Sequence, residues 1–136
     1  MATLIELECI KKMCSMVGPQ YEEATGVFTT GGSMGNLYGL LCARQRKYPE
    51  IMKDGQDGRK FVVFVSEECH YSCTMAANVL GLGYDNLVKV NVDESGCMDT
   101  ADLDKRVQEA KKAGKEPLAV IGTSGTTVRG AFDDCR

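Results

Sequence analysis

The chain has 136 residues, 43% of them hydrophobic and 26% charged, and a formal net charge of −3. These values fit one globular domain and exclude a disordered or collagen-like chain. The acidic balance and the absence of tryptophan argue against nucleic acid or an anionic membrane as a partner. Apolar runs are short, which argues against a membrane-spanning helix.

The cysteines indicate a reducing compartment. There are seven of them, an odd number at irregular spacing, and the first residues lack the layout of a signal peptide. Such a pattern argues against a disulfide framework. We therefore expect free thiols that pack as small apolar side chains, and a cytoplasmic location.

The first part of the chain predicts two helices with a loop between them. Apolar residues recur at helical spacing over residues 3–17 and again over residues 33–48. Residues 20–25 are polar, and residues 26–30 form a short run of high β propensity. Residues 49–60 are polar and contain glycine, which predicts a surface loop.

The remainder predicts strands that alternate with helices. Residues 61–65 are apolar throughout, as in a strand that is covered on both faces. Further strands are expected over residues 87–92 and 117–122, with helices ending near residue 80 and spanning residues 100–113. This order indicates an α/β fold with a mainly parallel sheet and flanking helices.

The helix over residues 100–113 has recognisable ends. Asp99 or Thr100 is suited to cap its first turn, and Gly114 is suited to the left-handed position that follows the last turn.

Three polar segments follow apolar or β-prone runs: residues 31–33, 66–72 and 123–127. Ligands of open α/β sheets bind beyond the carboxyl ends of the strands. We therefore expect the three segments to lie along one edge of the sheet and to share a ligand.

The first segment, Gly31-Gly32-Ser33, opens a helix. Free backbone N–H groups at a helix start attract anions, and glycine lets a phosphate approach the backbone closely. Ser33 adds a hydroxyl donor. The alternative is that Gly32 and Ser33 simply form a favourable helix start.

The second segment holds His70, the only histidine of the chain. It could act as a general acid or base, a metal ligand, a ring that stacks on a flat cofactor, or a structural residue. Cys69 and Cys73 lie close to it, but one histidine with these two thiols does not have a zinc-site spacing. A metal is therefore not expected.

The third segment places hydroxyl groups around Gly125. Thr123, Ser124, Thr126 and Thr127 could hold a phenolate or carboxylate oxygen, or could satisfy a tight turn among themselves.

These motifs resemble the group II pyridoxal-phosphate-dependent amino-acid decarboxylases, in the branch that acts on glutamate, cysteine sulfinate and aspartate. The likeness lies in residues 26–36, 66–72 and 122–133, with order and spacing kept. It implies the large domain of a fold-type I enzyme, the cofactor pyridoxal 5'-phosphate, a small acidic amino acid as substrate and a homodimer. Residues 1–25 would be an N-terminal helix and loop, and residues 26–136 an incomplete cofactor-binding core.

The resemblance also implies roles for individual residues. Gly32 and Ser33 match the segment that binds the cofactor phosphate. His70 matches a histidine that stacks on the pyridine ring and helps to position the substrate. Thr127 matches a threonine near the ring oxygen, with Thr123 and Thr126 as its neighbours.

The chain departs from the family pattern in three places. Gly35 stands where many relatives have serine. The aspartate that pairs with the pyridine nitrogen and the Schiff-base lysine have no match in residues 1–136, because His70, the only histidine, is followed by Tyr71. We therefore expect this chain alone to be inactive, as a fragment of the enzyme.

Two alternatives remain open from the sequence. An aminotransferase or lyase of the same fold would use the same cofactor for another reaction. A truncated paralogue without catalytic activity would instead bind or regulate an intact decarboxylase subunit.

Overall fold

The computed structural model describes residues 1–135. It divides into two compact units, Met1–Gly32 and the part of the chain from Ser33 onward. Among the described residues, no helix is both long enough and apolar enough to cross a membrane.

The first unit contains helix α1 (Ala2–Val17) and the 3-10 helix η1 (Pro19–Tyr21), so the helix predicted over residues 3–17 is confirmed. The strand-like run over residues 26–30 is not a strand, and that expectation was wrong. The Phe28 N–H donates to the Glu6 carboxylate at 2.8 Å instead of to another strand. A β-prone run forms a strand only where a partner strand accepts its hydrogen bonds.

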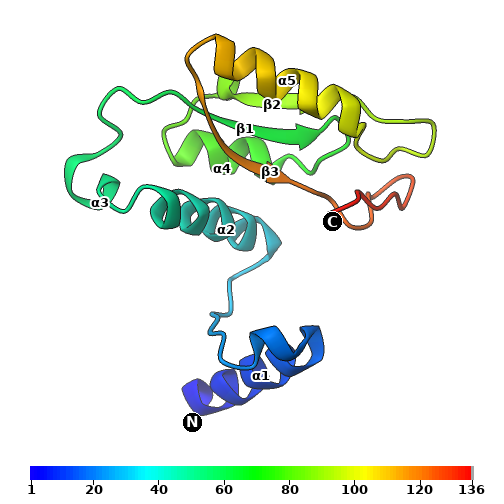
Figure 1. The fold of residues 1–136 in the computed structure, drawn as a ribbon. Helices are drawn as coiled ribbons and strands as arrows, with labels where there is room; N and C mark the ends of the chain where they lie inside the picture. The colour runs from blue at the N-terminus through cyan, green and yellow to red at the C-terminus, as the bar shows by residue number, and fades with distance from the viewer. Residues whose placement is uncertain (136) are drawn as a thin grey trace. The chain divides into compact units, whose positions relative to one another are not determined.

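The second unit is an α/β layer built on a three-stranded parallel sheet of order β2-β1-β3 (Figure 1). Its strands are β1 (Phe61–Ser66), β2 (Leu87–Val90) and β3 (Glu116–Ile121). Its helices are α2 (Gly32–Lys47), α3 (Ile51–Asp54), α4 (Ser72–Val79), η2 (Tyr84–Asn86) and α5 (Thr100–Lys112). The predicted fold class is confirmed.

Strand β1 forms the centre of the core because all six of its residues are buried. Val63 and Val65 pack into one cluster with residues of α2 and α4, and Val62 and Phe64 pack into another with residues of α5. Side chains of a strand alternate between its two faces, so this strand joins both layers. Figure 1 shows α5 on one side of the sheet and α4 on the other.

The ends of α5 agree with the sequence prediction. Asp99 is the N-cap, and its carboxylate accepts from the N–H groups of Ala101 and Asp102. Gly114 has φ 70°, and Lys115 donates its N–H to the Ala110 carbonyl, which together form a Schellman motif.

The segment between α2 and β1 was expected to be a loop throughout, but part of it is helical. Ile51–Asp54 forms the short helix α3, because Ile51 is buried in the core cluster and fixes the segment against the sheet.

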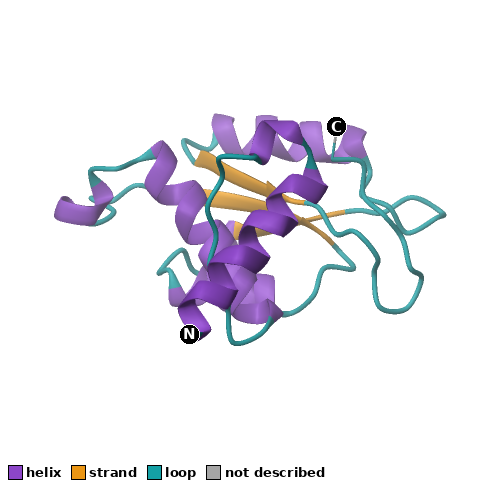
Figure 2. Cartoon of the chain, turned by 90° about the horizontal axis from the view of Figure 1, so that it is seen from below, coloured by secondary structure: helices purple, strands orange, loops and turns teal. Residues whose placement is uncertain are grey.

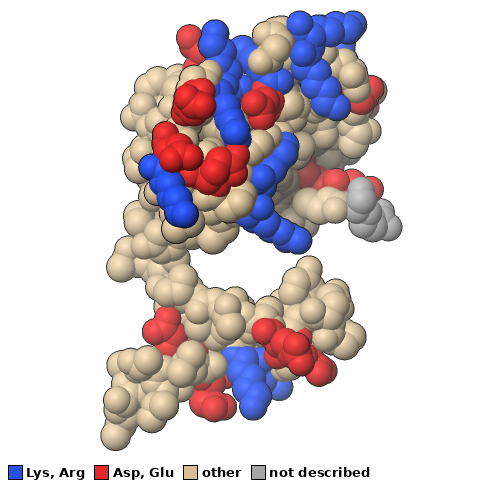
Figure 3. All heavy atoms as spheres, turned by 60° about the vertical axis from the view of Figure 1, so that its left-hand side comes forward, with Lys and Arg blue, Asp and Glu red and all other residues tan. Residues whose placement is uncertain are grey.

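Polar contacts fix the end of the sheet at which the strands begin. The Tyr48 hydroxyl donates to Glu116 at 2.5 Å, and Arg59 pairs with Glu50 at 2.7 Å. The hydrogen bond to Glu116 raises the pKa of Tyr48 to about 12. Figure 3 shows acidic and basic side chains next to one another in this view.

Candidate functional site

The polar segments that follow β1 and β3 lie at the same edge of the sheet. Parallel pairing sets Val65 beside Ile121 and Ser66 beside Val90, so the strands end together. The loops that follow the strands extend from one end of the sheet (Figure 2). Residues 66–72 and 123–127 are therefore neighbours at the edge where α/β proteins bind ligands.

Ser72 connects the start of α2 with the turn after β1. Its side chain is fully buried, and its hydroxyl oxygen accepts from the Asn36 amide at 2.8 Å. The same hydroxyl lies 2.8 Å from His70 Nδ1, and the Ser72 backbone N–H donates to that nitrogen at 3.2 Å. Asn36, Ser72 and His70 thus form one chain of hydrogen bonds.

These contacts determine how His70 presents its ring. Because a backbone N–H donates to Nδ1, this nitrogen acts as an acceptor, and in the neutral ring the proton lies on Nε2. The His70 side chain is exposed, with the Tyr71 ring tilted at 4.3 Å between centroids. An oriented, accessible imidazole is suited to stacking on a flat ring and to donating from Nε2.

Gly32 and Ser33 are the first two residues of α2, a helix of 16 residues without an acidic side chain in its first turn. Free N–H groups at this end carry partial positive charge. A Cβ placed on Gly32 would meet no atom within 4 Å, so the backbone is open at this point. The helix start can therefore accept a phosphate group.

The threonine-rich segment is partly a self-contained turn. Thr126 is buried, and its hydroxyl oxygen accepts from the Ala131 N–H at 3.0 Å. The N–H groups of Gly125 and Thr126 both donate to the Ala131 carbonyl. Thr127 is exposed, so its hydroxyl is accessible, whereas that of Thr126 is not.

Asp133 is a structural residue of the site that the sequence reasoning missed. Its carboxylate accepts from the Thr123 N–H and from the Met98 N–H, each at 2.7 Å. The side chain is only 8% exposed. No local pattern marks a carboxylate that binds backbone groups ten and 35 residues away.

Two hollows adjoin these segments. One, of about 320 Å³, lies between α2 and β3 and is lined by Asn36 and Gly122 among others. The other has a similar volume and is lined by Glu68, Thr126, Thr127, Val128 and Arg129. An ion pair of 3.0 Å between Arg129 and Glu68 connects the threonine segment to the turn after β1.

The predicted site residues are therefore brought together in two groups. His70 is connected to α2 through Ser72 and Asn36, whereas Thr126 and Thr127 are connected to Glu68. Thr123 is held at the end of β3 by Asp133. Neither hollow is lined by His70, so the two groups share an edge of the sheet but not one enclosed pocket.

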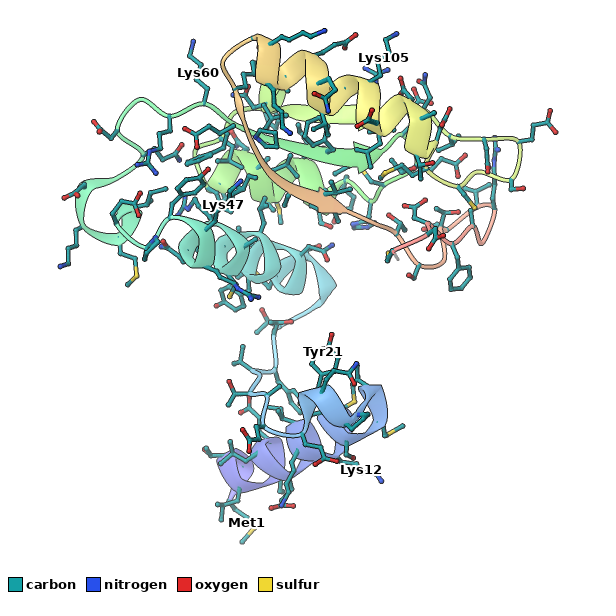
Figure 4. All side chains as sticks on the ribbon, in the orientation of Figure 1. Met1, Lys12, Tyr21, Lys47, Lys60 and Lys105 are labelled. Carbon is teal, nitrogen blue, oxygen red and sulfur yellow. The ribbon has the colours of Figure 1, made fainter. Side chains whose placement is uncertain are left out.

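Three lysines labelled in Figure 4 lie away from this edge. Lys47 donates to the Pro117 carbonyl at 2.6 Å, near the beginning of β3 rather than its end. Lys60 and Lys105 point outward from the sheet layer (Figure 4). Among the described residues, no three histidine, cysteine or acidic side chains are placed to hold a metal ion.

Comparison with known proteins identifies the family. A family model described as the pyridoxal-dependent decarboxylase conserved domain matches residues 1–136. The chain is 44% identical to the acidic amino acid decarboxylase GADL1 of Bos taurus over 131 residues. The matched region covers 96% of this chain and 25% of that protein.

Solved structures agree with this result. The crystal structure of mouse CSAD in apo form matches with a TM-score of 0.90 and 42% identity, over 96% of this chain and 27% of that one. The glutamate decarboxylase domain of a Vibrio parahaemolyticus protein, named as a diaminobutyrate-pyruvate transaminase and L-2,4-diaminobutyrate decarboxylase, matches with a TM-score of 0.89 and 33% identity. That match covers 98% of this chain and 30% of that one.

The chain spans about a quarter of the length of the curated relatives it matches. The family model, in contrast, covers the chain from its first residue to its last. The resemblance in the sequence motifs is thus confirmed, and the chain belongs to the pyridoxal-dependent decarboxylase family.

Proposed function

We propose that this chain forms the phosphate-binding and ring-stacking part of a pyridoxal 5'-phosphate-dependent decarboxylase. The complete enzyme would act on a small acidic amino acid (glutamate, cysteine sulfinate or aspartate), releasing carbon dioxide and the amine. The hydrogen-bonded chain Asn36–Ser72–His70 carries the proposal, because it connects the first turns of α2 to an accessible imidazole.

The donor set fits the cofactor. Gly32 and Ser33 offer backbone N–H groups and a hydroxyl at a helix start, which suit a dianionic phosphate. The flat imidazole of His70 suits the face of a pyridine ring. Thr127 offers a hydroxyl to the ring oxygen, and Thr123 and Thr126 form the turn that presents it.

Each residue then has a defined task. When bound, pyridoxal 5'-phosphate supplies an electron-accepting ring that stabilises the negative charge left when a carboxyl group departs. His70 holds one face of that ring, and Ser72 fixes the imidazole by occupying Nδ1. The proton on Nε2 is then available to a substrate oxygen, which positions the substrate for reaction.

Other properties of the complete protein follow from the family resemblance. We propose a homodimer, with the lysine and the aspartate that complete the cofactor site supplied by parts of the protein outside residues 1–136. The acidic substrate is supported by the relatives named above, and the odd, irregular set of cysteines supports a cytoplasmic protein.

Cofactor binding by this chain can be tested without the reactive aldehyde, which would label lysines at random. We suggest titrating the ¹⁵N-labelled chain with pyridoxine 5'-phosphate and recording amide shifts by NMR. The expected result is that signals of Ser33, His70 and Thr127 move together with one saturation curve.

Two controls separate the contacts. Pyridoxine without its phosphate should leave the Ser33 signal in place, because the anion is missing. The His70→Leu variant should keep the phosphate-dependent shift of Ser33 and lose most of the affinity. If the three signals move with different midpoints, or only His70 responds, the proposed shared site is wrong.

A further inference from the structure

Helix α1 carries an apolar stripe that the rest of its unit leaves uncovered. The helix, drawn in blue in Figure 1, buries none of its residues. The stripe consists of five exposed residues, Ala2, Ile5, Cys9, Met13 and Met16. Of these, Ile5, Met13 and Met16 are each at least 59% exposed. Large apolar side chains gathered on one exposed helix face indicate an interaction surface.

A different side of α1 holds the helix to its own unit. Glu6, Ile10 and Cys14 follow one another at steps of four residues, and all three are half-buried. The Glu6 carboxylate accepts from the Phe28 N–H at 2.8 Å, and the Cys14 thiol donates to the Ala24 carbonyl at 3.7 Å. The stripe is therefore not needed for the contacts that α1 makes within its unit.

The stripe is symmetric about Cys9. Ile5 and Met13 lie four residues before and after it, and Ala2 and Met16 lie seven residues before and after it. At about 100° per residue, the other four point within about 40° of the direction of Cys9. A second, antiparallel α1 would therefore place its Met13 beside Ile5 and its Met16 beside Ala2. Such self-complementarity is what a two-fold axis between identical surfaces requires.

The charges beside the stripe fit the same arrangement. Glu8 and Lys12 are four residues apart, so they border the stripe on one side. With the two-fold axis at Cys9, this border meets the same border of the second helix. Lys12 then lies within about 3 Å, measured along the helix axis, of Glu8 in the second copy. A parallel pair would instead set Glu8 beside Glu6 of the second copy, which brings like charges together.

We propose that α1 pairs antiparallel with α1 of a second copy of this chain, through the stripe and about a two-fold axis at Cys9. Each dimer then contains two contacts between Ile5 and Met13 and two ion pairs between Glu8 and Lys12. The pairing deepens the homodimer proposed above, on which it rests, by naming a surface for it.

Crosslinking of cysteines tests the position of the axis. A short bismaleimide adds one thiol across each of its two double bonds and releases nothing. Trypsin cleaves after Lys11, so Cys9 is the only cysteine of the peptide that spans residues 1–11. The expected product is two copies of this peptide joined by one linker. A product in which Cys9 is joined to another cysteine in place of a second Cys9 would overturn the proposal, because another segment would then cover the stripe.

Sedimentation equilibrium of the full chain measures the strength of the pairing. Ile5→Glu should raise the dimer dissociation constant at least about tenfold, because each dimer loses both contacts between Ile5 and Met13. Leu4→Glu is a matched control, since Leu4 is 67% exposed and points about 140° away from the stripe. It should change the constant less than about twofold. Both side chains are exposed, so neither variant should alter the far-UV circular dichroism spectrum.

Exchange of the charges tests the antiparallel direction. Glu8→Lys should raise the dissociation constant about threefold or more, because both ion pairs are replaced by like charges. Adding Lys12→Glu should restore the original value, since the pairs form again with their charges exchanged. A double variant as weak as Glu8→Lys would overturn the antiparallel arrangement.

Two further results would overturn the pairing itself: a wild-type chain that stays monomeric at millimolar concentration, or equal weakening by Leu4→Glu and Ile5→Glu. Neither result bears on the cofactor proposal, because the NMR titration is scored at Ser33, His70 and Thr127.

Discussion

Asp133 provides a direct test of how the threonine segment is held in place. Its two carboxylate oxygens each accept one backbone N–H, from Met98 and from Thr123. Asp93 offers a matched control, because its Oδ1 alone accepts from Ser95 and Cys97. Replacing each aspartate by asparagine keeps the size of the side chain and leaves one oxygen acceptor.

The two substitutions should differ in free energy. Asparagine at position 133 can keep only one of the two hydrogen bonds, and its NH₂ group then faces a backbone donor in a site that is 8% exposed. A hydrogen bond to a charged group contributes about 1.5–3 kcal/mol, so Asp133→Asn should cost about 2–3 kcal/mol. Asp93→Asn keeps both contacts through its carbonyl oxygen and should cost less than about 1 kcal/mol.

Urea unfolding followed by far-UV circular dichroism measures this difference. For a chain of this size the slope is about 2 kcal/mol per molar urea, so the midpoint of Asp133→Asn should fall by about 1 M. Amide hydrogen exchange gives a local readout, since Met98 or Thr123 should lose protection in this variant. Equal midpoint shifts for the two variants, with both amides still protected, would refute the two-oxygen bridge.

Three further predictions address the core and two titrating groups. Phe64→Ala should cost about 3–5 kcal/mol in the free energy of urea unfolding, because the ring is fully buried in β1; a cost below about 1 kcal/mol would contradict this packing. Tyr48→Phe should cost about 1–2 kcal/mol, by the same unfolding measurement, through loss of the bond to Glu116. Since that bond raises the pKa of Tyr48 from 10.0 to about 12, its stabilisation should be present below pH 10 and be lost as the pH approaches 12. The neighbouring Cys73 side chain and the charge of Lys89 lower the pKa of Cys69 to about 7, so its iodoacetamide alkylation should rise with pH to half its maximum near pH 7, and a midpoint near 9 would contradict this shift.

Local patterns were sufficient to predict the elements that form the core. The apolar run of β1 predicted a strand buried on both faces, because residues 61–65 are all apolar and side chains of a strand alternate between its two faces. Asp99 and Gly114 marked the ends of α5 because capping depends on groups within a few residues.

Long-range contacts account for the errors. Residues 26–30 have the propensity of a strand, but the N–H of Phe28 bonds to a glutamate side chain 22 residues away. Ile51 belongs to a polar segment by composition and is nevertheless buried against the sheet, which makes α3 possible.

In the candidate site, too, local patterns predicted some residues, whereas long-range contacts that the sequence does not reveal orient them. His70 and the start of α2 were visible as a lone histidine after a strand and a glycine pair before a helix. The partners that orient them, Ser72 and Asn36, are 36 residues apart and share no local pattern. Polar side chains that bridge two elements are recognised only when the fold is known.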